Sequence, residues 1–215
     1  MSSEIIVIGA GAQARVVFDI LSASGKAADV TAFVDLENRG ELTGQTVHGC
    51  RVIEGIDAFC EYARSHPVTV YLGHGNNSRR KDVFPILESL SVDIATAVHP
   101  SAIISPDVKV GPGTVISAGV IIITGAEIGK GCIINTAATV DHDCRVGDFS
   151  QIAPGANLAG RVTIGQETFI GIGACVIQNV SIGDGSVVGA GAAVVREVPA
   201  RCLVIGVPAR VRKKL

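Results

Sequence analysis

The stretch TVDHDCRVGD, residues 139 to 148, places His142 between Asp141 and Asp143. An imidazole is mostly neutral at pH 7 and can accept a proton, and a neighbouring carboxylate can fix its tautomer and stabilise the imidazolium. The pattern is typical of a general base, such as one that takes the proton shed by an amine during acyl transfer. A solvated turn histidine is the structural alternative.

The residues around His142 belong to a long repeat of period six. From Ile104 to Val194, every sixth residue is Ile, Val or Leu, sixteen positions in succession, and the position two residues before each is mostly small. Residues two apart on a strand face the same side, so both columns point inward. Three six-residue faces per coil predict a triangular parallel β-helix with a narrow interior, and we expect glycines such as Gly147 to supply its tight turns.

The repeat places His142 two residues past the inward Val140, on a turn at a corner of the prism. A single prism is convex and has no cleft. A corner histidine therefore becomes useful where another subunit packs against that edge, and a cyclic homotrimer with sites between subunits is the expected assembly.

The first part of the chain alternates strands with helices. EIIVI, residues 4 to 8, runs into GAGAQAR, in which Gly9, Gly11 and Ala14 match a phosphate-binding turn that opens a helix. A second strand ends at Asp35, and a third precedes a helix that starts near Ser78. The pattern predicts a short parallel sheet, a Rossmann-like half-domain over residues 1–98, followed by the β-helix over 99–215. Only half of a dinucleotide fold is present, which favours a nucleotide-sugar over NAD; a glycine turn needed only for packing is the alternative.

Composition narrows the class of protein. The chain has 215 residues, 47% of them hydrophobic, and a net charge of −2, without the basic stripe of a nucleic-acid binder. No apolar run is long enough to span a membrane, and we expect a cytoplasmic protein. The six cysteines form no C-x-x-C pair, so no zinc site or disulfide framework is predicted. The single histidine of residues 100 to 215 argues against a three-histidine zinc site of the carbonic anhydrase kind.

Taken together, the chain resembles the NeuD/PglD-type sugar O- or N-acetyltransferases, which join a small nucleotide-sugar-binding domain to a left-handed β-helix. The most specific stretches are INTAATVDHDCRVGDFSQIAPGANLAG, residues 134 to 160, and the C-terminal VIGVPARVRKK. The DHDCR form looks most like members that acetylate the 4-amino group of nucleotide-linked 4-amino-4,6-dideoxy sugars of the perosamine or bacillosamine type.

The resemblance implies roles for particular residues. His142 would be the general base and Asp143 its orienting partner, without a metal. The substrate would be held by Gly9, Gly11, Gln13, Asp35, Asn77, Arg79 and Asn135, and acetyl-CoA by Gln151, Ala159, Gly160, Gly206, Pro208 and Ala209.

Two positions depart from the family pattern. Gln13 and Gln151 stand where the family often has histidine, and glutamine can hydrogen-bond but cannot titrate. The third-strand turn, GHGNNSRR, also lacks the family's usual aspartate, and the sequence leaves UDP, GDP and dTDP open as the nucleotide.

The expected function is acetyl transfer from acetyl-CoA to the amine of such a sugar by direct attack. O-acetylation of sialic acid or another sugar is the alternative within enzymes. A nucleotide-sugar-binding or structural solenoid without catalysis is the alternative outside them.

Overall fold

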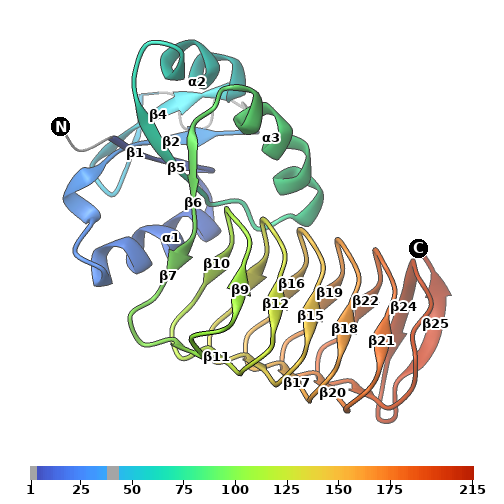
Figure 1. The fold of residues 1–215 in the computed structure, drawn as a ribbon. Coiled ribbons are helices and arrows are strands. Elements are labelled where there is room, and N and C mark those ends of the chain that lie inside the picture. The colour runs from blue at the N-terminus through green and yellow to red at the C-terminus, as the bar shows by residue number, and fades with distance from the viewer. Residues whose placement is uncertain (1–3, 38–43) are drawn as a thin grey trace. The chain divides into compact units, whose positions relative to one another are not determined.

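The computed structural model describes residues 4–37 and 44–215, which form two compact units, Met1–Pro100 and Ser101–Leu215. The first unit is a six-stranded sheet in the order β3-β4-β2-β1-β5-β6, parallel except for the β3–β4 hairpin (Figure 1). Its elements are β1 (Glu4–Ile8), α1 (Ala12–Ala23), a 3₁₀ helix (Ala27–Asp29), β2 (Val30–Asp35), β3 (Thr46–Val47), β4 (Cys50–Glu54), α2 (Gly55–Ala63), β5 (Val68–Leu72), α3 (Asn77–Ser89), β6 (Asp93–Ala95) and β7 (Ala97–Val98).

The apolar strands predicted in this unit lie at its centre. β1 pairs in parallel with both β2 and β5, and the three strands are almost entirely buried. The sequence prediction did not include α2, nor β4 and β6, which widen the sheet on both sides. The carboxyl ends of β1, β2 and β5 therefore meet at one edge, where ligands bind in parallel sheets.

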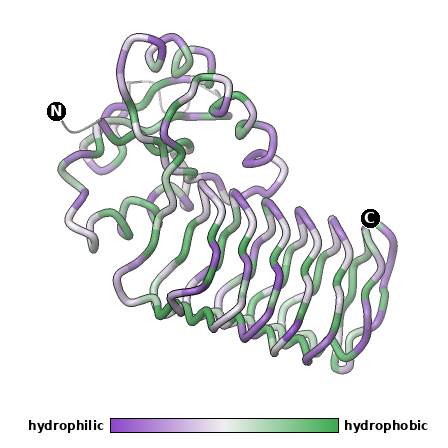
Figure 2. The backbone as a smooth tube through the Cα atoms, viewed as in Figure 1, coloured by the Kyte–Doolittle hydropathy of each residue, from purple (hydrophilic) through white to green (hydrophobic). Residues whose placement is uncertain are grey.

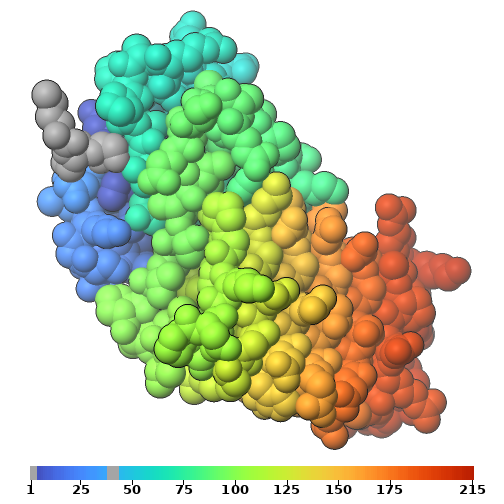
Figure 3. Space-filling view, in the orientation of Figure 1, coloured from blue at the N-terminus to red at the C-terminus, as the bar shows by residue number. Residues whose placement is uncertain are grey.

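The second unit is the predicted parallel β-helix. From β8 to β20, each strand of two residues pairs with the strand 18 residues further on, as Thr139 pairs with Asn157, so three strands make one coil. At the C-terminal end the offset shortens, and Val187 of β22 pairs with Leu203 of β24. The coils lie as adjacent bands along the unit (Figure 3). The strands are β8 (Ile103–Ile104), β9 (Lys109–Val110), β10 (Val115–Ile116), β11 (Ile121–Ile122), β12 (Glu127–Ile128), β13 (Ile133–Ile134), β14 (Thr139–Val140), β15 (Arg145–Val146), β16 (Gln151–Ile152), β17 (Asn157–Leu158), β18 (Thr163–Ile164), β19 (Phe169–Ile170), β20 (Cys175–Val176), β21 (Ser181–Ile182), β22 (Val187–Val188), β23 (Ala193–Val194), β24 (Cys202–Ile205) and β25 (Arg210–Lys214).

We name the three faces of the prism after successive strands of one coil. The β14 face contains β8, β11, β14, β17, β20 and β23, and the β15 face contains β9, β12, β15, β18 and β21. The β16 face contains β10, β13, β16, β19, β22, β24 and β25. The chain passes from the β14 face to the β15 face and then to the β16 face in every coil.

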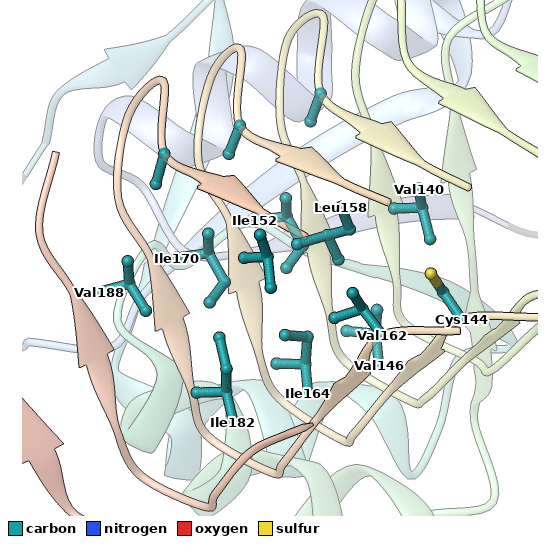
Figure 4. Packing of buried hydrophobic residues seen from close by; sticks show 14 of the residues in the cluster. Val140, Cys144, Val146, Ile152, Leu158, Val162, Ile164, Ile170, Ile182 and Val188 are labelled. Carbon is teal, nitrogen blue, oxygen red and sulfur yellow. The ribbon is translucent and has the colours of Figure 1, made fainter. Parts of the chain in front are cut away.

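Aliphatic side chains fill the interior of the prism (Figure 4). Hydrophilic and hydrophobic residues alternate along the backbone of the coils (Figure 2). The column from Ile116 to Val194 is at most 4% exposed at every sixth residue, whereas Ile104 and Val110 in the first coil are only partly buried. Burial of one such side chain contributes about 1.5 to 3 kcal/mol. The interior column was therefore predicted correctly, apart from its first members.

The small inward residues at the corner between the β15 and β16 faces form a hydrogen-bond ladder. The Ser150 hydroxyl donates to the Gly165 carbonyl (2.7 Å) and accepts from the Thr168 backbone N–H (3.0 Å). The Thr168 hydroxyl in turn donates to the Gly183 carbonyl. Narrowness alone suggested small residues here, but these side chains also satisfy buried backbone groups of the next coil.

Replacing Ser150 with alanine is expected to lower the free energy of unfolding by about 1 to 3 kcal/mol, because the part-buried Gly165 carbonyl and the buried Thr168 N–H both lose their hydrogen bond to the Ser150 hydroxyl. Chemical denaturation would measure the change. The control is Ser181→Ala on the outer surface of β21, expected within about 0.5 kcal/mol of the parent. Equal stability of the two variants would contradict the role of the ladder.

The glycines that follow the aliphatic column do not serve the purpose predicted for them. None of Gly111, Gly129, Gly147, Gly165, Gly183 and Gly189 has a positive φ. A Cβ on Gly147 would instead lie 2.7 Å from the Gln166 nitrogen of the next coil. The left-handed residues come two positions later and include Phe149 (φ 57°). Close approach of neighbouring coils, rather than turn conformation, therefore requires glycine at Gly147.

Candidate functional site

His142 lies on the turn that joins β14 to β15. The backbone N–H of His142 donates to Asp141 Oδ1 (2.7 Å), and Asp143 adopts the left-handed conformation with φ of 57°. Cys144 then points into the interior. The turn is thus anchored on both sides of His142, and the imidazole is 40% exposed at the corner of the prism.

The imidazole and the Asp143 carboxylate form a hydrogen-bonded pair, with His142 Nδ1 2.9 Å from Asp143 Oδ2. An ionised carboxylate can only accept, so Nδ1 of the neutral ring donates and Nε2 is left as the acceptor. The pair therefore presents an unprotonated nitrogen, which is the form that a general base requires.

The imidazole extends toward the next coil and lies over Gly160. A Cβ at Gly160 would come within 3.0 Å of three ring atoms, Nε2, Cε1 and Cδ2. Gly160 has no positive φ, so its backbone does not require glycine. Among the described residues, no hydrogen-bond partner is found for its backbone N–H. Gly160 thus leaves room for the ring, and its backbone N–H is available to a ligand.

A groove of about 510 Å³ runs along the β14 face next to the His142 turn. Asp141 and Ala159 line it near the histidine, and Cys175 and Ile177 line it further along. The turn from Gly206 to Ala209, which includes Pro208, lies at the far end of the same face. Two backbone hydrogen bonds hold it there: Ala193 N–H donates to the Gly206 carbonyl, and Ala209 N–H donates to the Ala193 carbonyl. The structure therefore places Ala159, Gly160, Gly206, Pro208 and Ala209 along one face.

Two residues predicted for the site do not lie at this corner. Asn135 is on the turn before β14, whereas His142 is on the turn after it, and Asn135 Oδ1 accepts the Thr136 backbone N–H (2.8 Å). Gln151 is an outward residue of β16, on the face opposite the His142 corner. Within one chain, neither side chain joins the His142–Asp143 pair.

The first unit has a crevice of about 520 Å³ at the carboxyl edge of its sheet, within the range of roughly 300 to 1,000 Å³ found for ligand pockets. Gly11 caps α1, and Gly9, at φ of 129°, packs so closely on Gly73 that a Cβ there would collide with its carbonyl. Gln13 lines the crevice, and its Nε2 is buried without a hydrogen-bond partner among the described residues. The turn therefore places the backbone at the start of α1 beside the crevice, with one unpaired side-chain donor buried behind it.

The loops that follow β2 and β5 form the walls of this crevice. Asp35, which lines the crevice, is buried, and its Oδ1 accepts the Glu37 backbone N–H (3.1 Å). Glu37 Oε1 lies 3.4 Å from both His74 Nε2 and Arg79 Nε. Burial lowers the pKa of His74, and the carboxylate of Glu37 opposes this effect.

A buried arginine holds the loop after β5. Arg80 Nη1 donates to the carbonyls of His74 and Gly75 (3.1 Å each), and Nη2 donates to Asn77 Oδ1 (2.8 Å). Asn76 caps α3 by accepting the Arg79 backbone N–H. Arg80 therefore engages Asn77 Oδ1, and the role of Asn77 in substrate binding stays a prediction.

Replacing Arg80 with methionine is expected to lower the free energy of unfolding by about 3 kcal/mol, because three hydrogen bonds from a buried charge are lost. Thermal unfolding of this variant and the parent would measure the loss of stability. The matched control is Arg79→Met, whose side chain is half exposed and whose loss should change stability by no more than about 0.5 kcal/mol. A stable Arg80→Met protein would show that the loop is held by other contacts.

Sequence reasoning missed Glu37, His74, Arg80 and Cys175. The helical spacing of Arg80 with the buried Val83, Phe84 and Leu87 was a signal that Arg80 lies on the inner side of α3. Cys175 precedes an inward residue of the repeat and therefore faces outward, two coils beyond Thr139 in the same groove. No comparable signal distinguishes Glu37 from other exposed acids.

Over residues 4–37 and 44–215, no cluster of three or more metal-ligating side chains is found. In the same ranges, no helix is long and apolar enough to cross a membrane.

The fold and the histidine corner define a hexapeptide-repeat acyltransferase. Family models match the chain as the PglD N-terminal domain over residues 4–87 and as the bacterial transferase hexapeptide, six repeats, over residues 161–196. Among curated proteins, no relative matches the chain.

Solved structures match the whole chain. PerB from Caulobacter crescentus, in complex with CoA and GDP-perosamine, is 36% identical with a TM-score of 0.91, over 99% of each chain. The acetyltransferase domain of PglB from Neisseria gonorrhoeae, in complex with acetyl coenzyme A, is 34% identical with a TM-score of 0.89, over 98% of this chain and 100% of that domain. The chain belongs to the NeuD/PglD-type sugar N-acetyltransferases, and its prism is the left-handed β-helix of that family.

Proposed function

We propose that this enzyme transfers the acetyl group of acetyl-CoA to the 4-amino group of a nucleotide-linked 4-amino-4,6-dideoxy sugar. The observation that carries the proposal is the His142–Asp143 pair, which presents an unprotonated Nε2 at the edge of the β14-face groove. The likeness over the full chain to an enzyme solved with CoA and GDP-perosamine supports the choice of substrates.

The mechanism of acetyl transfer follows from the tautomer of His142, in which Nε2 can accept a proton. The sugar amine attacks the thioester carbon, the C–S bond breaks, and His142 Nε2 accepts the proton that the amine sheds. The Asp143 carboxylate stabilises the imidazolium, which can then return the proton to the departing CoA sulfur. The Gly160 N–H would donate to the carbonyl oxygen as negative charge develops on it.

The groove fits an extended thiol cosubstrate. Apolar and small residues line most of it, together with the polar Asp141, Asn157 and Gln178, and Gly160 leaves room at its histidine end. The basic residues Arg210, Arg212, Lys213 and Lys214 lie exposed on β25, after the turn that ends the β14 face, and their charge suits the phosphates of CoA. Acetyl-CoA would thus lie along the β14 face, with its thioester at His142.

The crevice of the first unit would bind the nucleotide portion, through Gly9, Gly11, Gln13 and Arg79 beside Asp35.

The active protein would be a homotrimer. One prism leaves apolar side chains exposed on its β14 face, among them Ile103, Ile177 and Val195, and it leaves Asn135 and Gln151 away from His142. A neighbouring subunit would cover these apolar side chains and would supply its own Asn135 and Gln151 at the His142 corner.

The test is a thiol-release assay with acetyl-CoA and a panel of UDP-, GDP- and dTDP-linked 4-amino sugars, with free sialic acid as a hydroxyl acceptor. Turnover of at least one nucleotide-linked amine is expected. The proposal is wrong if no member of the amine panel turns over, and turnover of the free sugar alone would indicate O-acetylation instead.

A further inference from the structure

The groove on the β14 face contains a carboxylate that the repeat does not require. Among the described residues that line this groove, Asp141 is the one with a charged side chain. The matching positions in the coils on either side are Ile123 and Ala159, and both also line the groove. The fold therefore accepts an apolar or small side chain at this position, and an acid there needs another reason.

Asp141 has one oxygen engaged by its own turn and one that is open. Oδ1 accepts the backbone N–H of His142 (2.7 Å), and the backbone N–H of Asp141 donates to the Leu158 carbonyl (3.1 Å). No partner is found for Oδ2 among the residues that the structure describes. Since each carboxylate oxygen can accept hydrogen bonds, Asp141 presents a fixed acceptor to the groove, next in sequence to the base.

The other polar side chains of the groove are less suited to this task. The Thr139 hydroxyl donates to Asn157 Oδ1 (2.8 Å), and Asn157 Nδ2 donates to the Gly155 carbonyl (2.8 Å). Gln178 lies two coils beyond His142, roughly 10 Å away at the usual spacing of strands. Asp141 is therefore the acceptor that adjoins the reacting end of the groove.

An amine and a hydroxyl make different demands at that end. A primary amine brings two N–H groups to the thioester, and a hydroxyl brings one O–H. As the nitrogen lone pair forms the N–C bond, His142 Nε2 takes one proton, and the second hydrogen stays on nitrogen in the amide product. A donor buried without an acceptor costs about 1 to 3 kcal/mol. A hydroxyl oxygen would instead turn a lone pair toward the carboxylate.

We propose that Asp141 accepts the second N–H of the attacking amino group and thereby selects amine over hydroxyl acceptors. This inference rests on the proposed function, in which His142 Nε2 takes the first proton. The two residues are consecutive on one turn, and the hydrogen bond from His142 N–H to Asp141 Oδ1 fixes one relative to the other. Asp141 stabilises the positive charge that develops on nitrogen during the attack, and it exchanges no proton itself.

The experiment is calorimetric titration of the full chain, saturated with CoA so that no acetyl transfer occurs. The ligands are the amino sugar that turns over in the panel and its 4-hydroxy counterpart on the same nucleotide. The parent should bind the amine roughly 10-fold more tightly, the effect of one hydrogen bond to a charged acceptor.

Two neighbouring substitutions separate the carboxylate from the base. Asp141→Asn can still accept the His142 N–H through Oδ1, but it directs an amide donor at the groove, so the ratio of the two affinities should fall to about one. Its kcat/KM for the amino sugar should fall at least 10-fold, at an unchanged melting temperature. His142→Asn removes the base and leaves the carboxylate, so it should keep the affinity ratio of the parent.

Equal binding of the two sugars by the parent would overturn the inference and leave the proposed function intact. A preference for the amine that persists in Asp141→Asn would also overturn it, because another group would then read the amine. Loss of the preference in His142→Asn would assign the selection to the imidazole instead. Failure of the proposed function is a separate result, namely that no amino sugar of the panel turns over.

Discussion

Replacing His142 with asparagine is expected to lower kcat for acetyl transfer by about 10²- to 10⁴-fold, the contribution usual for a general base. Asparagine fits the turn and can hydrogen-bond to Asp143, but its amide cannot take a proton from the attacking amine. The measurement is initial thiol release from acetyl-CoA with the amino-sugar substrate identified from the panel. Since the His142 side chain is partly exposed, the variant should retain the melting temperature of the parent.

Two controls separate catalysis from binding. Affinity for CoA should change little in His142→Asn, because the cosubstrate groove on the β14 face remains. His66→Asn, which alters a surface histidine stacked on Tyr62 in the first unit, should leave turnover unchanged. Full activity of His142→Asn would remove His142 from the mechanism and would favour a role for the pair in shaping the corner.

The period-six pattern predicted the β-helix because each coil repeats the same steric demand. Three short strands that enclose a narrow interior need an aliphatic residue at every sixth position. Because Val140 is one of these inward residues, the same pattern placed His142, two residues later, on a corner. The pattern could not assign the tautomer of His142. That depends on the side-chain torsions that bring Nδ1 to Asp143 Oδ2.

Glycine shows where reasoning from sequence alone was insufficient. Glycine suits the left-handed turn position at Gly113 (φ 70°), although Phe149 occupies an equivalent position without it. Glycine is needed at Gly147 because of the next coil, and at Gly160 because of a side chain 18 residues earlier. Only the stacking of coils distinguishes the second and third cases. In the first unit, Arg79 and Arg80 are adjacent in sequence, and helix phase makes the first half exposed and the second a buried support.

Asn135 and Gln151 are the part of the candidate site that one chain does not bring together. Their separation from His142 follows from the geometry of the prism. Asn135, seven residues before His142, falls on the neighbouring corner, and Gln151, nine residues after it, falls on the opposite face. Sequence spacing suggested proximity because a family pattern records residues that act together, including those from different subunits. The trimer proposed above would reconcile the two, through contacts between chains.

Replacing Gly160 with alanine is expected to lower kcat by about 10²-fold with little loss of stability. The new Cβ would lie within 3.0 Å of Nε2, Cε1 and Cδ2 of His142, so the imidazole must move. The ring is partly exposed and can swing outward, which makes the clash inexpensive for folding. Movement of about 1 Å takes Nε2 out of line with the amine, and misplacement on that scale can cost roughly 10²-fold in rate. The backbone N–H of residue 160 is retained, so an effect on rate reports the histidine rather than the loss of a donor.

A double-mutant cycle tests this cause directly. In the His142→Asn background, where the ring is absent, adding Gly160→Ala should lower kcat by less than about twofold, so the two changes should be far from additive. Thermal unfolding of all four proteins would check that stability stays constant across the cycle. If Gly160→Ala lowers the rate equally in both backgrounds, its effect comes from the cosubstrate groove and not from the imidazole. If it leaves the parent fully active, the ring position in the structure is not the one that catalysis requires.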